Sequence, residues 1–399
     1  MRGLMLALGA LAVAYAATSF WINQGGGFAG HPRWCEWGLC NAELLEQEAK
    51  LQRIAGRSQR AMEFEIGLLE RNAASPFTWA HAGEGYQASG DPARARDCAA
   101  RSLQLGSSVA AAQMQVLNYY VGEDDREHVL STGRRLLSLV RQYDDFVFRY
   151  YDAVEASVET VLARGLPDQS DAAISYLEHL IGKPDQVGAE RTWAWMRSRS
   201  LGDDATANSY AGFLLRCGSI EKAWGAWNSY FHDAERLRGP SLVRNGGFEA
   251  ELSGGVFDWR VTPVEGAEAR LDAGCRHSGT RALRIDFAGT HNLEYRHVAQ
   301  RVLAVPGSRL RLRAWVRTEN LTTNEGVAIE VADMEHGAFR VQTEPVTGTT
   351  EWRRLECTFL LPKGVRLLEL EVLRKPSWKL DNKIQGTVWL DDITLEGGS

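Results

Sequence analysis

The sequence predicts a multidomain α plus β protein, in which a helical region precedes an antiparallel β-sandwich. From Asn41 to about Leu237, apolar residues recur at three- and four-residue steps, as on one face of an α-helix. Beyond Gly239 they alternate with polar residues, as in strands with one buried face. A length of 399 residues also exceeds that of most single cores, so we expect two folded domains.

The composition is that of an ordinary globular protein, with 44% hydrophobic and 24% charged residues. The formal net charge of −6 gives no general attraction to a phosphate backbone. Nucleic acid is therefore not an expected partner.

Residues 1–23 form the segment that we expect to direct export. The uncharged run over residues 4–22 is long enough to cross a hydrocarbon layer, which predicts a signal anchor in the membrane. The Ala14–Ala16 pattern is typical of a cleavage site, so a cleaved signal peptide is the alternative. The run continues to Ile22, which favours the anchor. Both interpretations place the following residues outside the cytoplasm, in the periplasm or at the cell surface.

Residues 24–40 form the predicted linker, which begins with a glycine-rich spacer. Cys35 and Cys40 are close enough in sequence to form a local disulfide. His31 and the two cysteines would provide three zinc ligands, but a fourth ligand is missing. We therefore favour a small disulfide loop, consistent with an exported protein.

Residues 41–238 form the predicted helical domain, because glycine and proline breaks divide it into helical hairpins. One hairpin resembles a tetratricopeptide repeat through Trp79, Ala82, Gly83, Tyr86, Ala95 and Ala99. This resemblance implies a solenoid of stacked α-hairpins whose concave surface binds a protein partner. The alternative is that the stack only spaces the second domain from the membrane.

Residues 241–399 form the predicted β-domain. The segment Arg309–Arg317 alternates apolar residues with arginines and a tryptophan, and three later segments alternate in the same way. Glycine and proline turns separate these segments, and no helical pattern of comparable strength interrupts them. This pattern predicts an antiparallel β-sandwich.

Five segments of this domain occur in an order that resembles a known family. They are NGGFE at Asn245–Glu249, a tryptophan at Trp259, HSGTRALRI at His277–Ile285, RLRLRAWVRTE at Arg309–Glu319 and WLDDITLE at Trp389–Glu396. Together they resemble a carbohydrate-binding module of the galactose-binding-like jelly-roll type, over nearly all of residues 242–396. The resemblance implies a jelly roll that binds a glycan or polysaccharide, although this fold also hosts protein- and lipid-binding modules.

The resemblance also implies a structural calcium ion held by Glu249 and Asp391. Calcium prefers oxygen ligands, and these carboxylates would join both ends of the sandwich. Asp391 shares the parity of Trp389, Ile393 and Leu395, which predicts that it points towards the core. The alternative is that Asp391 accepts backbone hydrogen bonds without a metal.

The polar face of the sheet is the predicted glycan site. A tryptophan flanked by guanidinium groups suits a sugar ring, which presents C–H patches and hydroxyl groups. We expect acidic residues of a later strand to face this tryptophan, and a loop to complete the edge of the same face. The predicted residues are Arg313, Trp315, Arg317, Glu369, Glu371, Trp378, Asn382 and Lys383. The alternative is a solvated or domain-facing surface of salt bridges.

No G-x-S-x-G, Walker-type or H-E-x-x-H motif is present, and the neighbouring Asp391 and Asp392 are expected to point to opposite faces. We therefore predict a non-catalytic extracytoplasmic scaffold that binds a protein partner and a glycan. Such a scaffold would assist the synthesis, export or retention of a surface polysaccharide. The alternative is a structural assembly subunit whose jelly roll contacts protein rather than sugar.

Overall fold

The computed structural model describes residues 2–23, 35, 37, 39–183, 185–230, 241–337 and 339–397. The described chain divides into two compact units, Met1–Leu201 and Gly202–Ser399. Most of the predicted linker over residues 24–40, including His31, lies outside the described residues. The predicted border between residues 238 and 241 lies outside them too.

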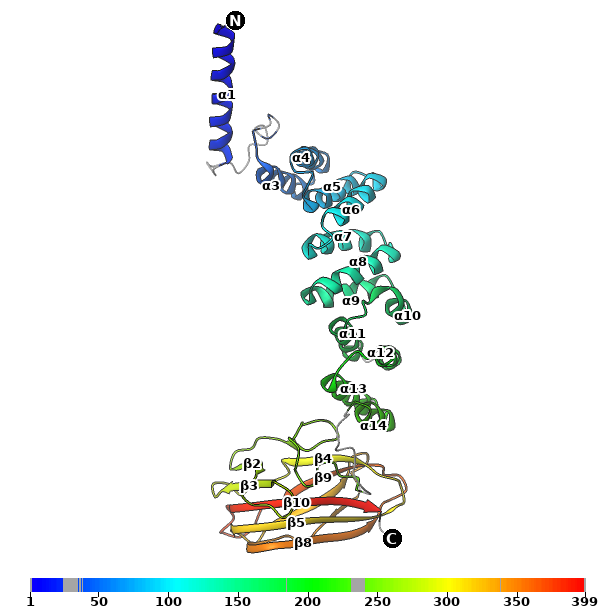
Figure 1. Cartoon of the computed structure of the whole chain (residues 1–399), viewed down its shortest axis with the longest axis vertical. Coiled ribbons are helices and arrows are strands. Elements are labelled where there is room, and N and C mark those ends of the chain that lie inside the picture. Colours follow the sequence, from blue (N-terminus) through cyan, green and yellow to red (C-terminus); the bar gives the residue numbers. More distant parts are fainter. Residues whose placement is uncertain are drawn as a thin grey trace. The chain divides into compact units, whose positions relative to one another are not determined.

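The first unit is helical, as predicted (Figure 1). Its helices are α1 (Arg2–Asn23), α3 (Ala42–Ile54), α4 (Ser58–Arg71), α5 (Pro76–Ala88), α6 (Pro92–Leu105), α7 (Ala110–Gly122), α8 (Arg126–Leu139), α9 (Asp144–Ala153), α10 (Val158–Thr160), α11 (Ser170–Gly182) and α12 (Gln186–Ser198). Two short helical turns, η1 (Arg141–Tyr143) and η2 (Val161–Gly165), complete it.

Local sequence explains where these helices begin and how closely they pair. Asn41, Asp91 and Asp125 each precede a helix and accept a hydrogen bond from the backbone N–H three residues later. In the α5–α6 pair, a Cβ added at Gly83 would lie 3.3 Å from the carbonyl oxygen of Ala95. The absence of a side chain at this position lets the two helices approach closely.

Among the described residues, no helix combines the length and the apolar character that crossing a membrane requires. The prediction of a membrane helix over residues 4–22 is therefore not supported by the structure.

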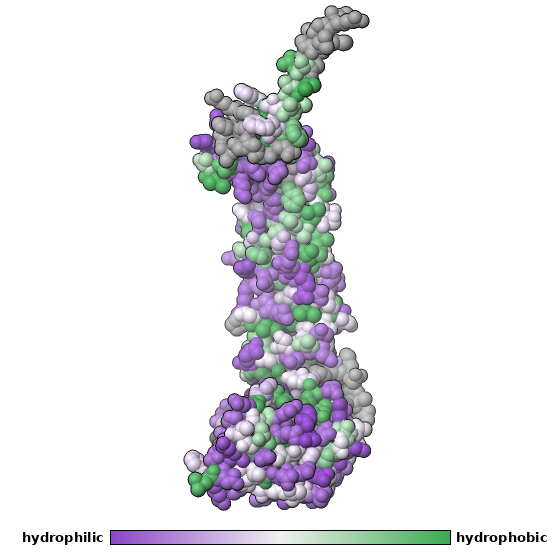
Figure 2. Space-filling model, turned by 90° about the vertical axis from the view of Figure 1, so that its left-hand side faces the viewer, coloured by the Kyte–Doolittle hydropathy of each residue, from purple (hydrophilic) through white to green (hydrophobic). Residues whose placement is uncertain are grey.

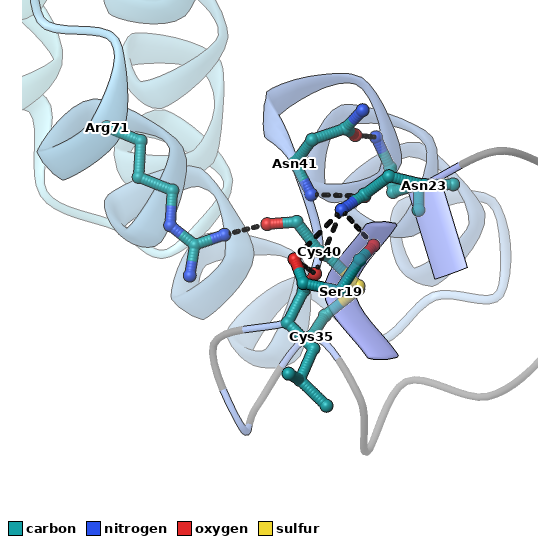
Figure 3. The surroundings of a disulfide bond; sticks show 8 residues. Ser19, Asn23, Cys35, Cys40, Asn41 and Arg71 are labelled. Atoms are coloured by element: carbon teal, nitrogen blue, oxygen red, sulfur yellow. Dashed lines mark hydrogen bonds between the residues drawn. A yellow bond between two sulfur atoms is a disulfide. The ribbon is translucent and has the colours of Figure 1, made fainter. Parts of the chain in front are cut away.

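A disulfide bond joins Cys35 to Cys40, with 4.7 Å between their Cα atoms (Figure 3). The Oδ1 atom of Asn23, at the end of α1, accepts a hydrogen bond of 2.7 Å from the backbone N–H of Asn41. The Arg71 guanidinium of α4 donates to the carbonyl oxygen of Cys40. The disulfide loop thus connects the end of α1 to the beginning of the helical stack, and the predicted local disulfide is confirmed.

The second unit begins with a helical hairpin, α13 (Asp204–Arg216) and α14 (Ile220–Asn228), and continues as an antiparallel β-sandwich. One sheet has the order β1-β4-β9-β6-β7 and the other the order β2-β3-β10-β5-β8. The strands are β1 (Arg260–Val261), β2 (Ala267–Asp272), β3 (Ala282–Ala288), β4 (Val298–Leu303), β5 (Arg309–Leu321), β6 (Val327–Asp333), β7 (Arg340–Gln342), β8 (Gly348–Leu360), β9 (Leu367–Arg374) and β10 (Gln385–Gly397).

The apolar residues of the alternating segments form the core between the two sheets, as predicted. Leu312 of β5, Ile329 of β6 and Leu370 of β9 are all buried in one cluster. Burying such side chains is the main favourable contribution to folding. In Figure 1, β10, β5 and β8 lie side by side in the sheet nearer the viewer.

The predicted orientation of Asp391 is wrong, because the alternation of core-facing and outward-facing side chains shifts by one residue within β10. Val388 and Leu390 lie in the core, and so do Ile393 and Leu395. This change requires the irregularity between Asp391 and Thr394, where Asp392 has a positive φ of 47°. Asp391 therefore lies on the outer side of its sheet, like Trp389.

The α13–α14 hairpin packs against the loop that precedes β1. Trp224 meets Phe257 edge to face, with ring centroids 5.2 Å apart. The side chain of Asn208 accepts a hydrogen bond of 2.7 Å from the backbone N–H of Val256. Glu221 also pairs with Arg366 at 2.7 Å. This hairpin thus belongs to the compact unit of the sandwich, whereas the sequence grouped it with the other helices.

Candidate functional site

The structure separates the predicted glycan residues into three places. Arg313, Trp315 and Arg317 lie on β5 in one sheet, whereas Glu369 and Glu371 lie on β9 in the other sheet. The prediction that these two groups share a face is therefore wrong. The remaining residues, Trp378, Asn382 and Lys383, lie in the loop between β9 and β10.

The outer face of the β5 sheet brings Trp315 together with two residues that the sequence analysis missed. His277 stacks on Trp315, with ring centroids 3.9 Å apart and 15° between the ring planes. Trp352 of β8 meets His277 edge to face at 5.7 Å. His277 is the first residue of the HSGTRALRI segment. The sequence analysis therefore identified the segment that contains His277, but not the contact between His277 and Trp315. Trp352 lies beside a register shift between β5 and β8, which local alternation does not reveal.

Two aspartates of β10 hold the turn that carries His277. Asp391 accepts hydrogen bonds from the backbone N–H groups of His277 at 2.9 Å and Ser278 at 3.1 Å. Asp392 contacts the His277 ring at 2.7 Å and accepts from the Ser278 hydroxyl at 2.8 Å. Asp391 is 0% exposed, and this burial raises the pKa of its carboxyl group. The parity change in β10 thus directs both side chains to one turn.

Glu249 holds the other side of the same turn. It accepts hydrogen bonds from the backbone N–H groups of Thr280 at 2.8 Å and Arg281 at 3.3 Å, and from the Thr280 hydroxyl. Burial raises the pKa of the Glu249 carboxyl, but these hydrogen bonds outweigh burial and lower the pKa overall. The two predicted calcium ligands therefore both contact residues 277–281.

The donors around these carboxylates favour the metal-free alternative. All four carboxylate oxygens of Glu249 and Asp391 accept N–H or O–H groups. The Arg281 guanidinium also donates, at 2.7 Å, to the carbonyl oxygen of Glu249. The described chain contains no group of three or more His, Cys, Asp or Glu side chains placed to hold a metal ion. The donor set thus fits backbone hydrogen bonding better than calcium, which requires six to eight oxygen ligands.

A hollow of about 370 Å³ opens between this turn and the sheet. It is lined by Gly274, Cys275, Arg276, His277, Ser278, Gly279, Arg317 and Trp352. The Arg317 guanidinium donates to the Sγ atom of Cys275 at 3.3 Å and lies over the Trp389 ring at 5.7 Å. These contacts position Arg317 while its side chain remains 36% exposed. Aromatic and guanidinium groups therefore line the hollow, together with the backbone of residues 274–279.

The rest of this face is a surface of ion pairs. Arg313 lies 3.8 Å from Glu356 and 3.7 Å from Glu396, outside the lining of the hollow. Arg284 pairs with Asp286 at 2.8 Å and lies over the Trp389 ring. For this part of the face, the salt-bridged alternative describes the structure.

The carboxylates of the other sheet are likewise in ion pairs. Glu371 and Glu330 lie opposite each other in register, and the Arg296 guanidinium donates to both. Burial raises the pKa of Glu371, whereas hydrogen bonding to Arg296 outweighs burial and lowers the pKa of Glu330. Glu369 pairs with Arg260 and lies 3.6 Å from Arg301. These carboxylates stabilise the sheet surface.

The helical unit has a hollow of its own, of about 230 Å³, between α3, α4, α5 and α7. It is lined by Glu46, Ala49, Lys50, Arg53, Glu65, Leu68, His81, Glu84 and Gln115. Arg53 pairs with both Glu65 and Glu84. The Glu65 side chain is 1% exposed, and its Oε2 atom has no hydrogen-bond partner within the described part of the chain. The sequence analysis did not identify this hollow.

Comparison with protein-family models and with curated proteins finds no match for this chain. Solved structures similar to it include a family 16 carbohydrate-binding module, with 20% identity over 39% of this chain and 98% of that chain, and a TM-score of 0.27. Another is a family 61 module in complex with β-1,4-galactotriose, with 18% identity over 40% and 100% of the two chains, and a TM-score of 0.27. The enzymatically active domain of a bacteriophage CBA120 tailspike shows 12% identity and a TM-score of 0.29 over 40% of this chain and 22% of the tailspike chain. These values are too low to assign a function.

Proposed function

We propose that the sandwich binds a glycan in the hollow beside Arg317 and Trp352. The observation that carries this proposal is the hollow itself, where indole, imidazole and guanidinium groups surround about 370 Å³ of open space. A sugar ring places its C–H patch against an aromatic ring and its hydroxyl groups against fixed donors. Arg317 provides such a donor, and the 274–279 backbone provides further polar groups.

We propose that this glycan binding is non-catalytic. Glycoside hydrolysis requires two carboxyl groups on opposite sides of one sugar, about 5–9.5 Å apart. Asp391 and Asp392 bind the turn at residues 277–278, and Glu351 lies 3.7 Å from Arg317. These contacts hold the wall of the hollow.

We further propose that the helical unit binds a protein segment through a basic side chain. The hollow between α3, α4, α5 and α7 is lined by the carboxylates of Glu46 and Glu84, whose side chains are exposed to solvent. A Lys or Arg side chain of a partner would pair with these carboxylates. A peptide array probed with the full chain and with Glu46→Gln/Glu84→Gln checks this. Peptides whose binding depends on the two glutamates should contain Lys or Arg, and a selection without that preference contradicts the proposal.

The Cys35–Cys40 disulfide supports an extracytoplasmic location, because disulfides persist in oxidising compartments. There, a chain that holds both a glycan and a protein partner would raise the local concentration of each. We therefore propose an accessory role in the synthesis, export or retention of a surface polysaccharide.

A glycan array probed with the full chain tests the proposed function. We expect binding to at least one extracellular or cell-wall glycan, and loss of that binding in Arg317→Ala. Arg313→Ala is the matched control, because it changes the same residue type on the same strand outside the hollow. Absence of binding to any glycan, or equal binding by both variants, would contradict the proposal. In the alternative, an assembly subunit, the Trp315 and Arg317 face is covered by protein and no glycan binds.

A further inference from the structure

The loop between β9 and β10 presents two large apolar side chains fully to solvent. Trp378 is 99% exposed and Leu380 is 104% exposed. The face of the sandwich visible in Figure 2 is mostly hydrophilic. Because large apolar side chains favour removal from water, two of them at one tip indicate a surface that becomes covered.

The exposure of these side chains does not come from an unanchored loop. Arg374, at the base of the loop, is 0% exposed and donates to the Asn292 side chain at 2.9 Å and the Asn382 carbonyl at 3.0 Å. The backbone N–H of Ser377 donates to the Asn292 side chain at 2.9 Å, and the Ser377 hydroxyl donates to Asn324 at 2.7 Å. The loop is thus fixed at Ser377, immediately before Trp378, and at Asn382, two residues after Leu380.

Basic residues surround the apolar tip. Lys375, Lys379 and Lys383 are all exposed, and Asp381 is the acidic residue within this segment. Residues 375–383 therefore carry a formal charge of about +2, in a chain whose total is −6. The tip combines apolar side chains and positive charge within nine residues.

We propose that this loop contacts an anionic lipid surface, with Trp378 and Leu380 entering the interface and the lysines contacting headgroups. Tryptophan is enriched at membrane interfaces, and lysines next to apolar residues bind anionic lipids. A glycan would explain Trp378 but not Leu380, which has no flat ring for a sugar. A protein partner is less suitable, because lysine is depleted in the cores of protein interfaces.

The lipid site adjoins the beginning of β10, whereas the glycan hollow adjoins its middle. Gln385, where β10 begins, follows the loop, and Asp391 holds the wall of the hollow six residues later. Six residues of a strand span roughly 20 Å. Lipid and glycan binding can therefore be tested separately.

Cosedimentation of the full chain with vesicles tests the proposal. We expect binding to equimolar phosphatidylcholine and phosphatidylglycerol that exceeds binding to phosphatidylcholine alone. Trp378→Ser/Leu380→Ser should abolish the excess, and each Lys→Glu change at the three loop lysines should reduce it by about fivefold or more. Every variant retains α1, so differences between variants report the loop.

Quenching by brominated lipid chains reports Trp378 directly. Wild type should show more quenching on the mixed vesicles than Trp378→Ser. Glycan binding and the melting temperature should be unchanged in the double-serine variant, since both side chains are exposed. Equal quenching, equal cosedimentation, or loss of glycan binding with lipid binding unchanged would each overturn the proposal.

Discussion

His277 stacks on Trp315 with ring centroids 3.9 Å apart and 15° between the ring planes. The backbone N–H of the same histidine donates to Asp391, on the neighbouring strand β10. The aromatic wall of the hollow therefore depends on a buried carboxylate that never reaches the hollow. Asp391 therefore links the stability of this turn to the shape of the proposed glycan site.

Replacing Asp391 with alanine should destabilise the sandwich. Asp391 accepts from three backbone N–H groups, those of His277, Ser278 and Asp392, which would lose their partner. We expect the free energy of unfolding to fall by about 2–4 kcal/mol, measured by urea denaturation. Asp381→Ala, at an exposed position, is the control and should change it by less than about 0.5 kcal/mol. A similar small change for Asp391→Ala would show that the turn is held by other contacts.

Removing divalent metal should leave the stability of the protein unchanged. The carboxylate oxygens of Glu249 and Asp391 already accept N–H and O–H donors, so the structure favours the metal-free alternative. We expect the same melting temperature with and without EDTA. A lower melting temperature in EDTA that added calcium restores would instead establish the calcium site which the family resemblance implies.

The Glu249 carboxylate should make the protein sensitive to acid. Its pKa lies below the ordinary 4.5, so the folded state keeps it charged at a pH where the unfolded chain takes up a proton. This contribution to stability is fully present above about pH 4.5 and is lost as the pH falls through the lowered pKa. The melting temperatures of wild type and Glu249→Gln should therefore differ most at neutral pH and converge in acid. A difference in melting temperature that does not vary with pH would show that packing, and not the charge of Glu249, causes the effect.

Gly246 should tolerate no side chain. A Cβ at this position would overlap the carbonyl oxygen of Ile393. The two backbones are held together, because the backbone N–H of Ile393 donates to the Gly246 carbonyl at 2.8 Å. Because the obstacle is backbone, Gly246→Ala should lower the free energy of unfolding by about 1–3 kcal/mol. Gly364→Ala has no atom within 4 Å of the added Cβ and should be nearly neutral. Equal stability of the two variants would contradict this packing.

The sequence predicted the helical half, the strands and their core faces, because those depend on local periodicity. Leu312 and Leu370, for example, both lie in the core as the alternation predicted. Alternation did not assign a strand to a sheet, because the order of strands is determined by long-range pairing. The sequence analysis therefore placed Trp315 and Glu371 on one face, whereas the two residues lie on different sheets.

The candidate site was predicted only in part, for two physical reasons. A bulge in β10 shifts parity between Asp391 and Thr394, and nothing in a regular alternation indicates it. The hollow also requires residues from separate segments, since His277 lies in a loop and Trp352 lies on β8. Such a constellation depends on tertiary structure. Arg317, which lines the hollow, was predicted from its place on one face of one strand, whereas Trp315 on the same face lies under His277 and outside the lining.

The most direct test of the proposed function compares glycan affinity in two tryptophan variants of the full chain. Trp352 lines the hollow, whereas Trp378 lies on the β9–β10 loop outside it. Removing an aromatic side chain whose apolar surface a ligand covers costs about 1.5 kcal/mol or more, so titration calorimetry with the glycan found on the array should show affinity reduced about tenfold or more in Trp352→Ala. Trp378→Ala should bind as wild type does. Unchanged affinity in Trp352→Ala, or a loss in Trp378→Ala alone, would contradict the assignment of the hollow as the glycan site.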